Sequence, residues 1–200
     1  MGSDELRVNG ERLLRRLFAL EEKGATSEGG CARLALTEED GAGRDLVVSW
    51  MRALGLDIRV DAVGNVVATY RPAGVPNVAP VLMGSHIDTV LTGGKYDGNL
   101  GVLAGLEVIE TIRDAGVVPA RPLAVAFFTD EEGSRFAPDM LGSLVYVGGL
   151  GSDAALDTIA VDGARLGDEL ERIGYAGPAP CPGPVPHAYV ELHIEQGPVL

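Results

Sequence analysis

Histidine and carboxylate side chains that could bind a metal ion stand in three separate stretches of this 200-residue chain. The first stretch runs from GSHIDTV to GGKYDGNLGV and holds His86, Asp88 and Asp97. In an extended segment, residues two apart point the same way, so Asp88 can hold one ring nitrogen of His86 and direct the other toward a metal. Asp97 stands in a glycine-rich loop, where it is either an ordinary turn residue or a carboxylate ligand.

The second stretch, FFTDEEGSRF, places three acids in a row, Asp130, Glu131 and Glu132, after a strongly apolar segment. Like charges this close repel one another unless a cation or a proton intervenes. One interpretation is a solvated loop edge. The chemical interpretation divides the work between the glutamates: one binds a metal, and the other is a free general base for a metal-bound water.

The third stretch, ELHIEQG, contains His193 between two apolar residues, so the sequence predicts a strand with a polar face shared by Glu191, His193 and Glu195. Mixed histidine and carboxylate ligands suit zinc and also manganese, cobalt or nickel. No cysteine pair has the spacing of a structural zinc site, and no G-x-S-x-G, P-loop or G-x-G-x-x-G motif is present. His187 stands in a proline-rich connector and is not assigned to the site.

Composition narrows the class of protein. Apolar residues make up 46% of the chain and charged residues 22%, which indicates a folded globule with a real core. The net charge of −13 argues against a nucleic-acid or anionic-membrane partner, because such surfaces attract clustered Lys and Arg. No membrane-length apolar run or signal peptide is found, and two distant cysteines favour a cytoplasmic protein with free thiols, one disulfide being the alternative.

The elements that must position these residues alternate along the chain. Helices are expected at 9–22, 44–54 and 99–115, with a mainly helical region over 139–174. Strands are expected at 56–60, 65–71, 79–86, 121–130 and 189–197. This alternation predicts an α/β fold, a three-layer sandwich with a mostly parallel sheet. Ligands bind at the carboxyl ends of strands in such sheets, so the three stretches are expected to meet there.

Taken together, GSHIDTV with GGKYDGNLGV, DEEGSRFAPDMLGS and ELHIEQGPVL resemble the M20-type di-metal amidohydrolases. Within them the sequence is most similar to the hydantoinase/carbamoylase group: N-carbamoyl-L-amino-acid hydrolases, β-ureidopropionases and allantoate amidohydrolases. The resemblance runs from about residue 10 to residue 200 and includes GGCARLALTEEDGAGRD and VGNVVATY. It implies that residues 1–200 form the N-terminal part of a zinc-aminopeptidase-like catalytic domain, with no second domain within the chain.

The resemblance also implies a ligand set, numbered here by this sequence. His86 and His193 would bind one metal, with Asp88 orienting His86 from behind. Asp97 would bridge both metals, and Glu132 would bind the second. The ions would be two divalent cations, Zn²⁺ or Mn²⁺, with Co²⁺ or Ni²⁺ as alternatives.

The implied activity is hydrolysis of linear amide C–N bonds in N-carbamoyl amino acids or related ureido compounds. A hydroxide bridging the metals would attack, with Glu131 as the general base, and Gln196 would contact the small-molecule substrate. The peptide bond between Asp97 and Gly98 would be cis in this family's pattern.

Two features of the resembling enzymes are not found in this sequence. They take a last ligand of the second metal, a histidine, from near their C-terminus, and they insert a lid and dimerisation domain after the HIEQG segment. The chain is therefore expected to be part of a longer protein, which would be a homodimer. Two alternatives stay open: an M20 peptidase or N-acyl amino-acid deacylase, and a truncated, non-catalytic fragment that binds metal. The strings EEGSRF and HIEQG favour the carbamoyl-type hydrolase.

Overall fold

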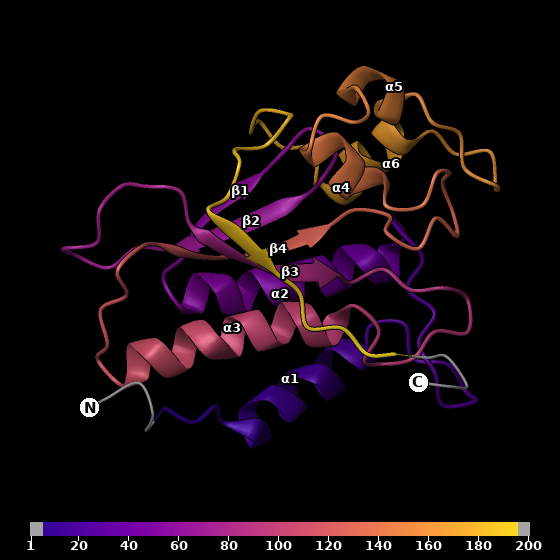
Figure 1. Cartoon of the computed structure of the whole chain (residues 1–200). Coiled ribbons are helices and arrows are strands. Elements are labelled where there is room, and N and C mark those ends of the chain that lie inside the picture. Colours follow the sequence, from indigo (N-terminus) through magenta and orange to yellow (C-terminus); the bar gives the residue numbers. More distant parts are fainter. Residues whose placement is uncertain (1–5, 196–200) are drawn as a thin grey trace.

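A mixed sheet with the strand order β1-β2-β4-β3-β5 runs through the computed structural model, which describes residues 6–195 (Figure 1). The strands are β1 (Asp57–Val60), β2 (Val66–Tyr70), β3 (Val81–His86), β4 (Leu123–Phe128) and β5 (Ala188–Val190). β4, β3 and β5 run parallel, whereas β2 is antiparallel to both β1 and β4. The predicted α/β fold with a mostly parallel sheet is confirmed.

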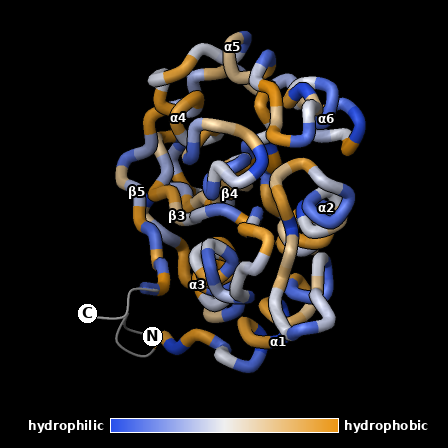
Figure 2. Tube along the Cα trace, turned by 90° about the vertical axis from the view of Figure 1, so that its right-hand side faces the viewer, coloured by the Kyte–Doolittle hydropathy of each residue, from blue (hydrophilic) through white to orange (hydrophobic). Residues whose placement is uncertain are grey.

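Helices cover the sheet from two sides (Figure 1). α1 (Gly10–Glu21), α2 (Glu38–Ala53) and α3 (Asn99–Asp114) lie below it, and α4 (Leu141–Tyr146), α5 (Ser152–Leu156) and α6 (Leu166–Ile173) lie above it. Figure 2 shows these layers from the side, with α1 and α3 below the strands and α4 and α5 above them. The three-layer sandwich predicted from the alternation of elements is therefore present.

α3 packs against β3 and β4. Leu103, Leu106 and Ile109, three residues apart, are all fully buried in the core cluster that also holds Val125 and Phe127 of the sheet. Burying one such side chain contributes roughly 1.5–3 kcal/mol. Gly105 brings the helix close to the strands, because a Cβ there would lie 3.0 Å from Val125. This close packing fixes the strands whose ends carry the polar stretches.

α2 begins six residues earlier than the sequence predicts, so the expected irregular segment up to residue 43 is wrong in its last part. Thr37 caps the helix by accepting a hydrogen bond from the amide of Asp40, and three acids occupy the first turn, where the helix dipole favours them. Gly41 and Gly43 weaken the helical pattern in the sequence. Gly43 is needed where it stands, because a Cβ there would lie 2.9 Å from the side chain of Arg33.

The last strand is much shorter than the predicted 189–197. β5 pairs with β3 only as far as Val190, which lies opposite Met83, and all three of its residues are exposed. His193 therefore lies beyond the strand and not within it. Both cysteines are free thiols. Among the described residues, no helix is long and apolar enough to span a bilayer.

Candidate metal centre

The polar stretches meet at the carboxyl ends of β3 and β4. His86 is the last residue of β3 and pairs in parallel with Phe128, the last residue of β4. Parallel neighbours end at the same edge of the sheet, so Asp88 and the acids that follow Phe128 emerge side by side. The expectation that the clusters converge at this edge follows directly from the register.

His86, Asp97 and His193 form one compact group of potential metal ligands. One ligand atom from each of them lies within 4.8 Å of the others. The Oδ1 atom of Asp97 is 3.2 Å from Nε2 of His193 and 3.8 Å from Nε2 of His86. The two imidazole rings stack with their centroids 5.8 Å apart. Two imidazoles and a carboxylate make a donor set suited to a divalent transition metal.

A main-chain carbonyl fixes the orientation of His86. Nδ1 of His86 lies 2.9 Å from the carbonyl oxygen of Asp88, which can only accept, so Nδ1 carries the proton and Nε2 keeps its lone pair. The Asp88 carboxylate is farther away, with Oδ1 3.9 Å from Nδ1. Its two oxygens instead accept hydrogen bonds of 3.3 Å from the amides of Glu131 and Glu132. Asp88 therefore contacts His86 through its main-chain carbonyl, and it contacts the amides of Glu131 and Glu132 through its carboxylate.

The two glutamates occupy different settings. Glu131 reaches the group of ligands, with Oε2 3.4 Å from Nε2 of His86, and its side chain is about one-third exposed. Glu132 has a buried oxygen, Oε1, without a hydrogen-bond partner among the described residues. A buried polar atom without a partner is costly, and a cation would satisfy it. Glu132 therefore fits a metal-ligand role although it lies outside the group of three.

Burial changes the acidity of this cluster. Burial, with the charges of Asp97, Asp88 and Glu131 adding to it, raises the pKa of Glu132 to about 7. Burial also raises the pKa of Glu131, and neighbouring His86 opposes that rise. For Asp130, burial and the nearby Asp88 raise the pKa to about 8. Carboxyl groups crowded together in this way hold protons near neutral pH unless a cation replaces them.

The loop after Asp97 departs from one expectation. The prediction of a cis bond between Asp97 and Gly98 is wrong, since the cis peptide bonds in the described part of the chain precede Pro138 and Pro182. Gly98 has a positive φ of 63° and packs against His86, where a Cβ would lie 2.5 Å from the ring. A glycine is therefore required there on both counts.

Residues 82–200 match peptidase family M20/M25/M40. The chain belongs to this family. An N-carbamoyl-L-amino-acid amidohydrolase from Rhizobium meliloti is 45% identical to this chain over 194 residues. The alignment covers 97% of this chain and 46% of the Rhizobium protein. An enzyme of the same description from Geobacillus stearothermophilus is also 45% identical, covering 96% of the chain and 48% of its own length.

A solved structure gives the same result for the fold of the M20 chain. The crystal structure of a hydantoinase/carbamoylase family amidase from Burkholderia ambifaria superposes with a TM-score of 0.92 at 49% identity. The superposition covers 97% of the M20 chain and 47% of that protein. The chain therefore spans about half the length of the relatives it matches, and the resemblance seen in its motifs is confirmed at the level of family and fold.

The residues expected at the site and those that the structure brings near it differ in part. Gln196, expected to contact substrate, lies outside the described residues. Asn99 is the first residue of α3, directly after the capping residue Gly98. The side chain of Asn99 accepts a hydrogen bond from Arg33, a residue that the sequence analysis does not single out. The available signal was a charged residue inside the apolar string CARLAL.

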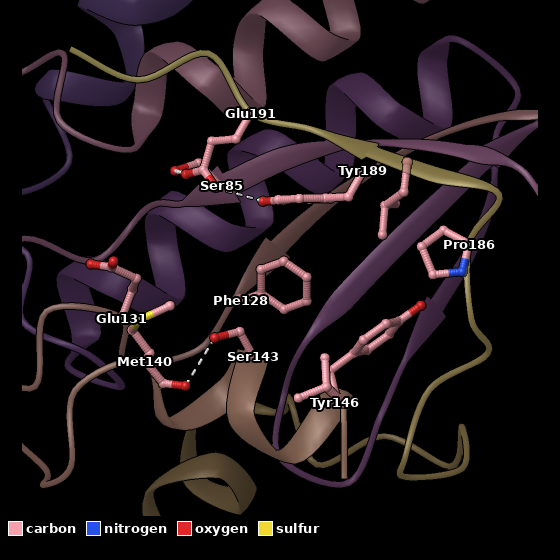
Figure 3. Close-up of a pocket in the computed structure, with 11 residues that line it drawn as sticks. Ser85, Phe128, Glu131, Met140, Ser143, Tyr146, Pro186, Tyr189 and Glu191 are labelled. Carbon is pink, nitrogen blue, oxygen red and sulfur yellow. Dashed lines mark hydrogen bonds between the residues drawn. The ribbon is translucent and has the colours of Figure 1, made fainter. Parts of the chain in front are cut away.

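An apolar pocket of about 240 Å³ lies beside Glu131 in the M20 chain (Figure 3). Leu82 and Phe128 of the sheet, Tyr146 of α4 and Tyr189 of β5 contribute to its wall. Glu131 and Glu191 bring the carboxylates that line it, and Glu191 accepts a 2.8 Å hydrogen bond from the hydroxyl of Tyr189. Glu131 thus stands at the border between the ligand group and an apolar cavity, a setting that favours its protonated form.

Proposed function

We propose that this chain is part of a metal-dependent amidohydrolase that cleaves linear amide C–N bonds in N-carbamoyl amino acids or related ureido compounds. The observation that carries the proposal is the gathering of His86, Asp97 and His193 beside two half-buried glutamates, Glu131 and Glu132. Membership of the M20 family and the named activities of the similar proteins support it. In this proposal the chain is the N-terminal part of the catalytic domain.

The ligand roles follow from the donor atoms. His86, Asp97 and His193 would hold one divalent cation, and Asp97 and Glu132 would hold a second. Zn²⁺ and Mn²⁺ are proposed, with Co²⁺ and Ni²⁺ as alternatives, because histidine and carboxylate ligands suit all four. When bound, such ions act as Lewis acids and lower the pKa of water toward neutrality.

The protein groups supply proton transfer and orientation. Glu131, half-buried and with its pKa raised by burial, would take a proton from the attacking water and deliver it to the leaving nitrogen. The carbonyl of Asp88 holds Nδ1–H of His86, so Nε2 stays directed at the ligand group. Hydrolysis of the carbamoyl group would consume one water and release the free amino acid, ammonia and carbon dioxide.

The test is ammonia release from N-carbamoyl-L-amino acids, β-ureidopropionate and allantoate by the purified protein loaded with Mn²⁺ or Zn²⁺. Glu131→Gln is expected to lower the rate by about 10²–10⁴-fold, the usual contribution of a general base. Glu191→Gln is the matched control, because Glu191 lines the same pocket but bonds to Ser85 and Tyr189, whereas the ion-pair partners of His86 among the described residues are Asp88, Asp97 and Glu131. Full turnover by Glu131→Gln would refute the mechanism.

The same assay separates the alternatives. Release of an amino acid from a dipeptide or an N-acetyl amino acid, without ammonia from any carbamoyl compound, would favour a peptidase or deacylase. Metal binding without turnover of any of these substrates would favour a non-catalytic metal-binding fragment. For the whole protein we also propose a homodimer, which light scattering tests, and a cytoplasmic location, which the free thiols support.

A further inference from the structure

The guanidinium of Arg33 is fully buried and connects segments that are far apart in the sequence. Nε donates to the carbonyl of Ile87 at 2.7 Å, and Nη2 donates to Oδ1 of Asn99 at 2.8 Å. Nη1 donates to the carbonyls of Leu20 at 2.9 Å and Lys23 at 2.7 Å, at the end of α1. The side chain therefore uses every nitrogen of its planar fork.

Two of these partners lie next to proposed metal ligands in the sequence. Ile87 directly follows His86 at the end of β3, and Asn99, the first residue of α3, is the second residue after Asp97. One guanidinium thus holds both segments while Nε2 of His86 and Oδ1 of Asp97 lie 3.8 Å apart. The separation of these two ligands depends on how far apart the two ends of the Arg33 fork keep their partners.

The main chain of Arg33 is anchored to the same region. Its amide donates to Oγ1 of Thr89 at 2.8 Å, and the amide of Thr89 donates to its carbonyl at 2.9 Å. Gly43 leaves room for the side chain, because a Cβ there would lie 2.9 Å from it. With backbone and side chain both held, the guanidinium is a rigid spacer, which a lysine cannot replace because its three donors radiate from one atom.

The cost of this arrangement indicates that it has a purpose beyond filling the core. Within the described residues, Arg33 donates to carbonyls, an amide oxygen and a thiol sulfur, and it forms no ion pair with a carboxylate. A buried charge without a paired carboxylate is expensive compared with an apolar side chain of similar volume. We propose that Arg33 is a positioning residue that sets the separation of His86 and Asp97 and thereby the affinity of the site for a divalent cation.

This inference rests on the metal site of the proposed function, and Co²⁺ titration followed by its visible absorption tests it. Arg33→Lys and Asn99→Ala each remove the connection through which the Arg33 guanidinium joins the segment after His86 to the segment after Asp97. Loss of a group that orients a metal ligand typically costs 10–100-fold in metal affinity, and we expect that increase in the dissociation constant for both variants. The double variant is expected to bind no more weakly than Arg33→Lys alone, because both changes break one link.

Arg44→Lys is the matched control. Arg44 is equally buried and donates to Asp40, to the carbonyl of Gly64 and to Thr129, but to neither Ile87 nor Asn99. Its replacement is expected to lower the free energy of unfolding of the metal-free protein, measured in urea, and to leave the Co²⁺ dissociation constant within about twofold of wild type. Equal loss of affinity in Arg33→Lys and Arg44→Lys would overturn the proposal.

Two further outcomes keep the test decisive. If Arg33→Lys does not fold, Asn99→Ala decides, because it removes only the hydrogen bonds of Asn99 with Arg33 and with the carbonyl of Lys95 and leaves Arg33 in place. Unchanged affinity in that variant overturns the inference. A wild-type protein that binds no Co²⁺ also overturns it. A wild-type protein that binds Co²⁺ but releases no ammonia refutes the proposed hydrolysis, while the affinities of the variants still decide the role of Arg33.

Discussion

Replacing Gly98 by alanine would place a methyl group in the space that the ring of His86 occupies. The added Cβ would lie 2.5 Å from Cδ2 and Nε2 of His86, whereas ordinary contacts begin at 3.4 Å. The ring would have to move by about 1 Å, and a displacement of that size at a catalytic centre costs about 100-fold in rate. Gly98→Ala is therefore expected to lose about that factor in turnover and to bind Co²⁺ more weakly.

The substitution also strains the backbone, and a second glycine isolates that effect. Alanine at a positive φ costs roughly 1–2 kcal/mol. Gly116 has a φ of +66°, close to the +63° of Gly98, but no atom lies within 4 Å of a Cβ built on it. Gly116→Ala therefore places an alanine at a similar positive φ without the contact to His86.

The assay compares both variants with wild type in urea unfolding, Co²⁺ titration and ammonia release. Gly116→Ala is expected to lose roughly 1–2 kcal/mol of unfolding free energy, and Gly98→Ala at least as much, because it adds the contact with His86. Only Gly98→Ala is expected to lose Co²⁺ affinity and turnover per folded molecule. Equal losses of Co²⁺ affinity and turnover in the two variants, or no such loss in Gly98→Ala, would refute the reasoning that this glycine is needed to make room for His86.

Three further predictions concern the carboxyl groups. Co²⁺ binding is expected to tighten as pH rises through about 7, because Glu132 must lose its proton to bind; a flat titration from about pH 6 to 8 would contradict this. The pKa of Asp130 is about 8 in the folded protein and about 3.8 in the unfolded chain. Between these pH values the metal-free folded state binds one proton that the unfolded state does not. The free energy of unfolding therefore falls by a few kcal/mol as the pH rises from about 4 to 8. Asp130→Asn is expected to remove that slope in urea unfolding, and a slope unchanged in the variant would assign it elsewhere. Asp88→Ala is expected to speed amide hydrogen exchange at Glu131 and Glu132 while ¹⁵N NMR still finds the Nδ1–H form of His86, since the carbonyl remains; a changed tautomer would show that the carboxylate orients the ring.

The parts of the fold that the sequence predicts well have strong, local signals. The apolar runs before His86 and around Phe127 predict β3 and β4 to within about two residues, because strands buried on both faces need continuous apolar side chains. The periodic leucines of α3 predict that helix for the same kind of reason. The convergence of the polar stretches then follows from parallel pairing of β3 and β4.

The sequence predicts poorly wherever a distant contact decides the structure. The start of α2 is hidden by Gly43, whose reason for being there is the space it leaves for Arg33. The end of β5 depends on where its pairing with β3 stops, which the alternation around His193 does not reveal. The contacts of Arg33 with Ile87 and Asn99 are also long-range, so no spacing rule exposes them.

The ligand group joins His86 and Asp97, near the middle of the described residues, to His193, near their C-terminal end, and this has a consequence for the order of synthesis. A growing chain exposes His86 and Asp97 about a hundred residues before His193, and closing a loop of that length costs about 4 kcal/mol of chain entropy. Of the other proposed ligands, Glu132 emerges within that interval and His193 emerges last, so the group of His86, Asp97 and His193 is incomplete until then. Under the proposed function, the first cation would therefore gain its full set of ligands from this chain only after the segment with His193 has been made and has packed beside Asp97.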